Sequence, residues 1–247
     1  MNQLVRSNEF REVLDSYKLS AEAKATLDEI RLALLVGPSS SGKNTLINKL
    51  VKTGGYHSIV SDTTRKPRLN NGVLEENGRE YWFRSEDAVL ADLKAGAFLE
   101  AAIIHGQQVS GTSIRELQSA RDDHKIAINE IEVVGADHVH QLVPSAQCLF
   151  ILPPSFDDLI TRMNARSKLP ADETRRRLVS AAMEVGMALS KDYYTFVVND
   201  DIAHTVTRVD RILHEGNANG IEDQAYAQGV AEQLLIDTKH FLANLEQ

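Results

Sequence analysis

Residues 37–46, GPSSSGKNTL, form a glycine-rich stretch whose residue types could hold phosphate. The stretch fits the pattern G-x-x-x-x-G-K-[ST] at seven places, and Asn44 stands where the pattern has a hydroxyl residue. In such a loop, successive backbone N–H groups point at phosphate oxygens, and the following helix adds its positive N-terminal end. Lys43 would reach the terminal phosphates as a point charge. The pattern therefore predicts a nucleotide site.

The segments on either side of this loop supply the context that its chemistry needs. RLALLV, 31–36, is a continuous apolar run that predicts a buried strand, and TLINKLV, 45–51, has helical spacing. A strand, a glycine turn and a helix would aim the backbone N–H groups at one point. The loop residues expected to bind the nucleotide are Gly37, Ser39, Ser40, Ser41, Gly42, Lys43, Asn44 and Thr45.

A second phosphate site is indicated by SIVSDTTRKPR, 58–68. Arg65 and Arg68 are three residues apart, and Pro67 between them favours an extended chain. Two guanidinium groups can hold one phosphate through paired hydrogen bonds. A solvated basic turn is the alternative, but the position about twenty residues after a phosphate loop favours the site.

A third cationic segment runs from Arg162 to Arg177. The stretch between them contains SKLPADETR, which is polar and interrupted by Pro170. We interpret residues 163–177 as a lid whose closure brings cations to a reacting phosphate and excludes water. An ordinary loop with exposed arginines is the alternative.

The apolar runs 126–133, 147–152 and 195–199 predict further inner strands, each followed by a polar or helical segment. Alternating strands and helices predict an α/β fold with a parallel sheet whose ligands bind at the carboxyl ends of the strands. Ser155, with Asp158 three residues later, predicts a capped helix start after the strand 147–152.

Two end segments flank this alternating region. Residues 1–30 predict a helical extension, because Phe10, Val13, Leu14 and Tyr17 recur at helical spacing and Ser20 could cap a second helix. Residues 214–223 predict a linker, followed by an amphipathic helix with Val230, Leu234, Phe241 and Leu245 on one face. We expect this helix to pack on its own domain, with a homodimer contact as the alternative.

Net charge, the single cysteine and the length of the apolar runs indicate which classes of protein this sequence does not fit. The net charge of −8 argues against a general binder of nucleic acid or of anionic membranes, although a local cationic pocket fits an acidic protein. The sole cysteine, Cys148, lies in an apolar run and is expected to be a buried thiol. The first residues lack the apolar core of a signal peptide and no apolar run approaches the length of a membrane span, so we expect a cytoplasmic protein.

The order of these motifs resembles the guanylate kinase family. GPSSSGKNTL, SDTTRKPR, NGREYWF, GAFLEAAIIHG, NEIEVVGA, FILPPSFDDLITRMNAR and FVVND follow one another over residues 31–213. The resemblance implies a nucleoside monophosphate kinase-like parallel sheet flanked by helices, with a GMP-binding subdomain at about 58–115 and a lid at about 163–177. It implies phosphoryl transfer from ATP, with Mg²⁺, to GMP or dGMP.

The resemblance also implies roles for individual residues. Arg65, Arg68 and Tyr81 match positions that hold the GMP phosphate, and Ser61, Glu100, Thr112 and Glu132 match positions that read guanine. Asn44 and Glu130 match positions near the magnesium ion, and Asn199 matches an adenine contact. Lys43 and the arginines that close around ATP, Arg162, Arg166 and Arg177, match the catalytic cations.

The chemistry of guanine supports these assignments independently. Its pairing edge shows N–H donors at N1 and N2 beside the O6 acceptor, so a carboxylate such as Glu100 suits the donors. A hydroxyl from Thr112 or Ser61 suits O6. Adenine reverses this pattern and would leave buried polar groups unpaired, so we expect it to be rejected.

Four departures from the family pattern stand out. Asn44 replaces a hydroxyl residue, and the loop between Arg68 and Tyr81 is longer than usual. A second phosphate-holding tyrosine is missing from 107–111, where Ser110 or Val109 takes its place, and Glu130 and Glu132 are longer than aspartate. These departures predict weaker GMP binding. They leave two alternatives: a non-catalytic module that binds a phosphorylated protein, or a related kinase for another phosphorylated acceptor.

Overall fold

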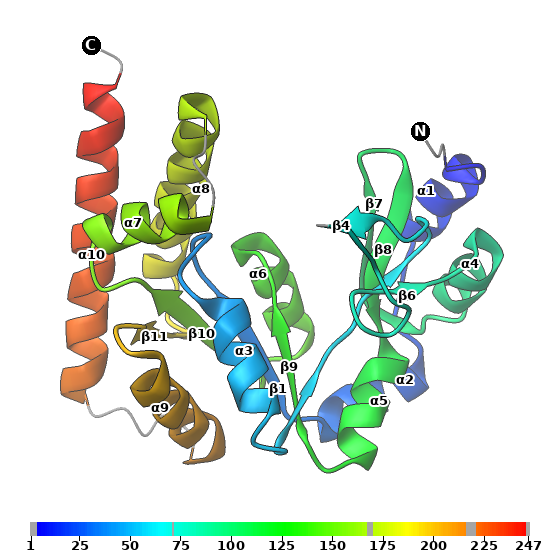
Figure 1. The fold of residues 1–247 in the computed structure, drawn as a ribbon. Helices are drawn as coiled ribbons and strands as arrows, with labels where there is room; N and C mark the ends of the chain where they lie inside the picture. The colour runs from blue at the N-terminus through cyan, green and yellow to red at the C-terminus, as the bar shows by residue number, and fades with distance from the viewer. Residues whose placement is uncertain (1–3, 71, 167–169, 216–220, 246–247) are drawn as a thin grey trace. The chain divides into compact units, whose positions relative to one another are not determined.

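The computed structural model describes residues 4–70, 72–166, 170–215 and 221–245. The chain divides into two compact units. The first comprises Met1–Arg31 and His57–Ala127, and we call it the arginine unit because it carries Arg65 and Arg68. The second comprises Leu32–Tyr56 and Ile128–Gln247, and we call it the loop unit because it carries residues 37–45. Figure 1 shows the elements of both units.

A five-stranded sheet has the strand order β11-β10-β1-β9-β2. Strand β10 pairs in parallel with both β1 and β11, which confirms the predicted parallel α/β fold. All five residues of β1 are buried, as expected for an apolar strand covered on both faces. The strand bounds are Leu32–Val36 (β1), Tyr56–Ser58 (β2), Ile126–Glu130 (β9), Gln147–Leu152 (β10) and Tyr194–Val198 (β11).

The expected strand 126–133 is too long by three residues. Strand β9 ends at Glu130, and Glu132 is already the N-cap of the next helix, α6 (Val133–Leu142). Val133 continues the apolar run of the strand in the sequence, but its side chain lies on the buried face of helix α6. The spacing of apolar residues alone does not show where the strand ends and the helix begins.

The helices of the loop unit are α3 (Lys43–Val51), α6, α7 (Phe156–Arg166), α8 (Ala171–Leu189), α9 (Ile202–Glu215) and α10 (Ile221–Asn244). The predicted capped start of α7 is confirmed, because Ser155 Oγ accepts a hydrogen bond from the N–H of Asp158 at 3.1 Å. The predicted linker 214–223 is shorter than expected, since α9 and α10 extend into it from both sides. Residues 216–220 lie outside the described residues.

Helix α10 packs along α8 and against β11, which confirms that it packs on its own domain (Figure 1). The predicted face is the one that packs, but its burial is incomplete near the end of the helix. Leu234 is buried, but Leu245 is 54% exposed and Phe241 is 36% exposed, although the Phe241 ring contacts Phe156. Ala227 and Ala231 are buried on the same face as Leu234, and their small side chains permit close approach to the neighbouring helix.

The N-terminal extension forms α1 (Ser7–Asp15) and α2 (Ala21–Glu29) within the arginine unit. Ser20 caps α2 as predicted, accepting a hydrogen bond from the N–H of Ala23 at 3.0 Å. The helical spacing in α1 is also confirmed, because Phe10 is fully buried in a cluster with residues of α4 (Glu86–Lys94) and β7 (Phe98–Ile104). Val13, Leu14 and Tyr17 pack against the same cluster.

A second sheet in the arginine unit has the order β6-β3-β8-β7 and is mostly antiparallel. Its strands are β3 (Asp62–Thr63), β6 (Trp82–Phe83), β7 and β8 (Gln108–Ser113), and helix α5 (Ile114–Asp122) follows. The longer loop after Arg68 contains a small hairpin of β4 (Leu69–Asn70) and β5 (Val73–Leu74). Across the described parts of both units, no helix is long and apolar enough to cross a membrane.

Candidate active site

The loop between β1 and α3 requires glycine at two positions. Gly37 has a φ of 133°, and a Cβ atom there would lie 2.3 Å from the backbone oxygen of Ile151. Gly42 has a φ of 100°, and its Cβ would lie 2.2 Å from Asn199 Nδ2. Only glycine combines this backbone conformation with the close approach of neighbouring chain segments.

Lys43 is almost fully buried at the start of α3, with a side chain 7% exposed. Its Nζ donates hydrogen bonds to the backbone oxygens of Gly37 at 2.5 Å and Pro38 at 2.9 Å, and it lies 3.4 Å from Glu130 Oε1. The ammonium group therefore folds back over its own loop. A phosphate group could replace these carbonyl oxygens as its partner.

The hydroxyl groups of Ser40 and Ser41 are buried and have no hydrogen-bond partner among the described residues. A buried donor without a partner costs about 1–3 kcal/mol, so such groups usually mark a place where a ligand or water completes the bonding. Both hydroxyls belong to the loop that the sequence pattern assigns to phosphate.

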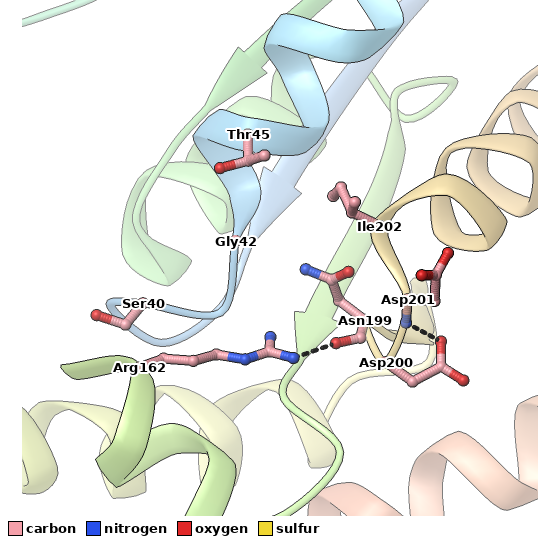
Figure 2. A pocket seen from close by; sticks show the side chains of 8 residues that line it. All are labelled: Ser40, Gly42, Thr45, Arg162, Asn199, Asp200, Asp201 and Ile202. Atoms are coloured by element: carbon pink, nitrogen blue, oxygen red, sulfur yellow. Dashed lines mark hydrogen bonds between the residues drawn. The ribbon is translucent and has the colours of Figure 1, made fainter. Parts of the chain in front are cut away.

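A cleft of about 430 Å³ opens beside the loop (Figure 2). Asn199 connects its walls, because its Nδ2 donates to the backbone oxygen of Ser41 and its own backbone oxygen accepts from Arg162 Nη2, both at 2.8 Å. The structure thus brings the expected residues Ser40, Gly42, Thr45, Arg162 and Asn199 to one cleft, which is also lined by Asp200, Asp201 and Ile202.

Three glutamates of the loop unit, Glu130, Glu132 and Glu184, interact electrostatically with Lys43 or with one another. Burial raises the pKa of Glu184, in α8, to about 7, and the charges of Glu132 and Glu130 add to this rise while Lys43 opposes it. Glu184 was not predicted, because a glutamate within a helix has no distinctive sequence signal. Asn44 is exposed, and no group of three metal-binding side chains occurs among the described residues.

The expected lid is only partly described. Residues 167–169 lie outside the described residues, as does the side chain of Arg166, the last residue of α7. Arg177 lies in α8, where its Nε donates to Glu173 Oε1 of the preceding turn at 2.8 Å. Of the three lid arginines, the structure therefore places Arg162 in the cleft and pairs Arg177 with a carboxylate.

In the arginine unit, Arg65 is held on several sides. Its Nη1 and Nη2 donate to the two carboxylate oxygens of Glu75 at 2.5 Å and 2.8 Å, and its guanidinium lies 4.7 Å from the Tyr81 ring centroid. It also lies 5.4 Å from the ring centroid of Phe83. Hydrogen bonds from Arg65, outweighing the cost of desolvation, lower the pKa of Glu75 to about 2.

Arg68 shares the same carboxylate through its backbone. The Arg68 N–H donates to Glu75 Oε2 at 2.8 Å, while its side chain is exposed. Arg65 and Arg68 therefore share one acidic side chain that was not predicted, and the Tyr81 ring lies against Arg65. Glu75 lies in the longer loop, where neither spacing nor composition distinguishes it from Glu76 beside it.

Two expected guanine-reading residues lie directly opposite each other. Glu100 of β7 pairs in register with Thr112 of β8. Ser110 lies two residues before Thr112 and so shares its face, and its hydroxyl bonds to Thr63 Oγ1 at 2.9 Å. Val109 is fully buried in the hydrophobic cluster, so Ser110 is the residue on the site face where the tyrosine is missing.

Ser61, the third expected guanine reader of this unit, is held by its own backbone and by contacts of its neighbours Val60 and Asp62. Its backbone oxygen accepts from the N–H of Trp82 at 2.9 Å. Glu116, only 4% exposed, accepts from the N–H of Val60 at 2.9 Å and from Trp82 Nε1 at 2.7 Å, and lies 3.3 Å from His57 Nε2. Burial raises the pKa of Glu116, but the hydrogen bonds outweigh burial and lower it overall.

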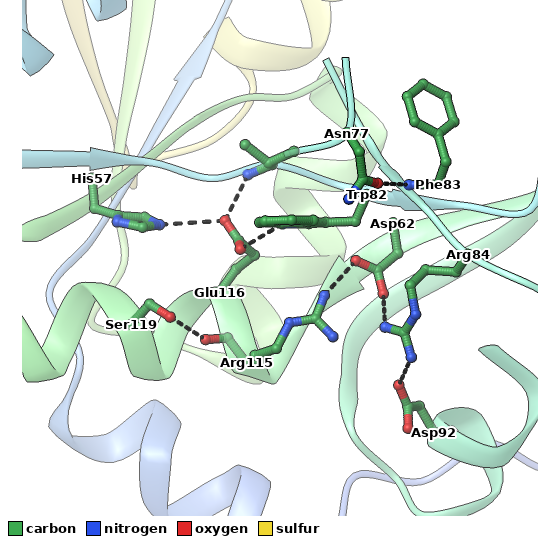
Figure 3. A network of polar contacts seen from close by, with 11 residues as sticks. His57, Asp62, Asn77, Trp82, Phe83, Arg84, Asp92, Arg115, Glu116 and Ser119 are labelled. Carbon is green, nitrogen blue, oxygen red and sulfur yellow. Dashed lines mark hydrogen bonds and ion pairs between the residues drawn. The ribbon is translucent and has the colours of Figure 1, made fainter. Parts of the chain in front are cut away.

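Asp62 anchors the chain on the other side of Ser61. It is fully buried and accepts from Arg84 Nη1 and Arg115 Nη2, each at 2.9 Å, while Arg84 also contacts Asp92 (Figure 3). Burial raises the pKa of Asp62 although both arginines oppose the rise. Glu132, the remaining expected guanine reader, is exposed in the loop unit at the N-cap of α6.

Comparison with known proteins gives consistent results. A family model described as guanylate kinase matches residues 29–216. The guanylate kinase of Corynebacterium diphtheriae is 34% identical over 185 residues, which cover 74% of this chain and 94% of that protein. The guanylate kinase of Corynebacterium efficiens is 32% identical over the same shares of both chains.

A solved structure agrees with this family. The crystal structure of guanylate kinase from Anaplasma phagocytophilum matches with a TM-score of 0.53 at 25% sequence identity. The match covers 82% of this chain and 93% of that one. Helix α10 begins after the last residue of the family match.

Proposed function

Because this chain belongs to the guanylate kinase family, we propose that it transfers the γ-phosphoryl group of ATP to GMP, giving ADP and GDP. The observation that carries the proposal is that one chain holds two groups of residues suited to binding phosphate. A phosphate loop with a buried lysine serves the donor. An arginine pair, in the same unit as a facing glutamate and threonine, would serve a guanine monophosphate.

The loop unit would bind ATP. Backbone N–H groups of the loop residues 39–42 and the N-terminus of α3 receive the phosphates, and the unpartnered hydroxyls of Ser40 and Ser41 gain acceptors. Lys43 exchanges backbone carbonyls for the β- and γ-phosphate oxygens. Asn199, at the edge of the cleft, is the proposed adenine contact.

The arginine unit would bind GMP. Arg65, Arg68 and Tyr81 hold its phosphate, while Glu100 accepts from the N1 and N2 donors of guanine and Thr112 donates to O6. AMP offers an acceptor where Glu100 needs a donor, so the carboxylate would lose its partner. Ser61 completes the proposed base site of this unit, and Glu132, in the loop unit, stays a predicted guanine reader.

The reaction needs positioning and charge compensation more than proton transfer. An oxygen of the GMP phosphate, largely dianionic near pH 7, forms a bond to the γ-phosphorus as the bond to the β,γ-bridging oxygen breaks and ADP leaves. Lys43, Arg162, Arg166 and Arg177 would neutralise the charge on the transferring group. No strong general base is required.

The donor set of the loop unit fits a magnesium ion carried by ATP. Mg²⁺ usually takes one or two protein ligands and completes its shell with water and phosphate oxygens, so the lack of a three-ligand cluster in the described chain suits it. Asn44 and Glu130 would hold it. When bound, the ion neutralises charge on the β- and γ-phosphates.

Three finer points stay predictions. We expect dGMP to serve as an acceptor beside GMP, the protein to work in the cytoplasm, and nucleic acids and membranes not to be partners. A homodimer contact stays the alternative role for the exposed side chains of α10, and light scattering would test it.

The proposal is tested by following GDP formation from Mg-ATP and GMP. Arg65→Ala removes charge-assisted hydrogen bonds of about 1.5–3 kcal/mol, which predicts a roughly ten- to hundredfold loss in kcat/KM for GMP. Arg79→Ala is the matched control, because Arg79 lies in the same loop and is half exposed. No GDP from the unmodified protein would contradict the proposal, and so would an unchanged kcat/KM in Arg65→Ala.

A further inference from the structure

One carboxylate connects both phosphate-binding arginines of the arginine unit. Glu75 Oε1 accepts from Arg65 Nη2, and Glu75 Oε2 accepts from Arg65 Nη1 and from the backbone N–H of Arg68. The side chains of Arg65 and Glu75 are only 9% and 10% exposed. Such a paired contact, shielded from water, fixes the orientation of a guanidinium plane as well as its position.

The pairing uses a particular edge of the Arg65 guanidinium. Both Nη1 hydrogens are committed, one to Glu75 and one to the backbone oxygen of Lys66 at 3.0 Å. Nη2 gives one hydrogen to Glu75. The Nε hydrogen and the second Nη2 hydrogen point along the other edge of the fork. Arg65 also has a hydrogen bond with Tyr81, itself an expected phosphate-holding residue. Within the described residues, Glu75 is the only carboxylate that pairs with Arg65, so no second acid competes with a phosphate bound side-on at this edge.

The hairpin of the longer loop delivers this carboxylate. Residues 69–74 leave Arg68 and return to Glu75, whose N–H donates to the backbone oxygen of Arg68 at 3.0 Å. The backbone of Arg68 is thus bonded to Glu75 in both directions. The loop that departs from the family pattern in length therefore closes on the phosphate-binding arginines.

We propose that Glu75 is a positioning residue of the acceptor site, which orients Arg65 and the Arg68 backbone for the phosphate of the nucleoside monophosphate. This inference rests on the proposed function. Without Glu75, the long Arg65 side chain would keep only its contacts with the Tyr81 and Phe83 rings and with the Lys66 carbonyl. More of its ordering would then fall on phosphate binding, which would reduce affinity by about three- to tenfold. The negative charge of Glu75 opposes the phosphate, so a net loss of affinity on its removal is the signature of positioning.

The test is a calorimetric measurement of the Kd for GMP and, separately, for guanosine, which has the base but no phosphate. Glu75→Ala is expected to raise the Kd for GMP about three- to tenfold and leave the Kd for guanosine unchanged. Glu76→Ala is the matched control, because Glu76 is the next residue and is 64% exposed, and it should change neither Kd. An equal loss for guanosine would show general damage and overturn the proposal.

A double-mutant cycle then shows whether Glu75 acts through Arg65. In the Arg65→Ala protein, Glu75→Ala is expected to have little further effect on the Kd for GMP. Additive losses would overturn the proposal, as would unchanged or tighter GMP binding in Glu75→Ala alone. If Glu75→Ala does not fold, Glu75→Gln takes its place, because it keeps one acceptor oxygen. It should raise the Kd for GMP by a smaller factor and again leave the Kd for guanosine unchanged, whereas an unchanged Kd for GMP would overturn the proposal.

Binding and turnover separate this inference from the function on which it rests. A protein that binds GMP with the expected dependence on Glu75 but forms no GDP would contradict the phosphotransferase and leave the positioning role supported. A protein that forms GDP with the same kcat/KM for GMP after Glu75→Ala would contradict the positioning role alone.

Discussion

The two units build their proposed phosphate sites by different means. In the loop unit, Lys43 bonds to backbone oxygens five and six residues away, and two glycines allow the tight turn. In the arginine unit, Arg65 meets a carboxylate ten residues away, and the chain around Ser61 is anchored by Glu116, more than fifty residues later. The loop site depends on backbone conformation, and the arginine site depends on pairs of charged side chains.

This difference predicts different vulnerabilities. A loop of backbone groups has few side chains to lose but has no space for an added atom. A site made of ion pairs tolerates changes in volume but is damaged by the loss of either charge, because the remaining partner stays buried. Substitutions that add an atom in the loop or remove a charge in the arginine unit should therefore have the largest effects.

Gly37→Ala should be the most damaging of these substitutions. Its Cβ would lie 2.3 Å from the backbone oxygen of Ile151 at a φ of 133°, and we expect a loss of about 3 kcal/mol in the free energy of unfolding. Urea denaturation measures it. Gly106→Ala is the control, since Gly106 also has a positive φ but nothing within 4 Å, and should cost about 1–2 kcal/mol. Equal costs at both positions would refute the role of close approach.

Glu116→Ala tests the arginine unit in the same way. The substitution leaves Trp82 Nε1 and the N–H of Val60 without their acceptor, which should cost about 2 kcal/mol of stability. It should raise the KM for GMP through Ser61 and leave the KM for ATP unchanged. Asp122→Ala, on the same helix and 67% exposed in its side chain, serves as the control. A raised KM for ATP instead would count against a role confined to this unit.

The loop and the arginine unit also differ in how much of each could be predicted from the sequence. Residues 37–45 form a local pattern, so the strand, the turn, the helix and the proposed role of Lys43 follow from neighbouring residues alone. Glu75, Glu116 and Glu184 could not be predicted, because their roles depend on partners brought close by the fold. The four-stranded sheet of the arginine unit was missed for a related reason: two of its strands are only two residues long and show no alternation.

The spacing of apolar residues in α10 also led to an expectation of more burial than the structure shows. Phe241 and Leu245 continue, at helical spacing, the face that carries the buried Ala227, Ala231 and Leu234, yet they are 36% and 54% exposed. Spacing gives the face of a helix but not how far along the helix a neighbour covers that face. Burial near the end of α10 is therefore less certain from spacing than burial in α1, where Phe10 lies in a cluster with residues of other elements.

Glu184→Gln tests whether the loop unit, like the arginine unit, also depends on a largely buried charge. The folded-state pKa of Glu184, about 7, exceeds its ordinary value of 4.5, so ionisation destabilises the fold as pH rises from 4.5 to 7. The glutamine variant should be more stable than the unmodified protein by about 1 kcal/mol above pH 7, allowing for partial exposure, and equally stable below pH 4.5. Thermal unfolding at pH 4 and pH 8 measures this. A pH-independent difference would show that Glu184 is not the titrating group.

Asn44→Thr should have the smallest effect. It restores the hydroxyl that the loop pattern has at this position, and Asn44 is exposed, so no packing change is expected. The Mg²⁺ concentration that gives half-maximal rate should fall by a few fold, at unchanged KM for GMP. Asn44→Ala is the control and should raise that concentration. Identical magnesium dependence in all three proteins would show that residue 44 is not a metal contact.

The most direct test of the phosphotransferase is ADP release from Mg-ATP with GMP, dGMP, AMP, CMP and UMP offered separately, using Lys43→Ala as the blank. We expect turnover with GMP and dGMP, little with the other three nucleotides, and none in the blank. Turnover with another acceptor in preference to GMP would contradict the guanine assignment of Glu100 and Thr112. No turnover with any acceptor, by a protein that still binds ATP or GMP, would contradict the proposed catalysis itself.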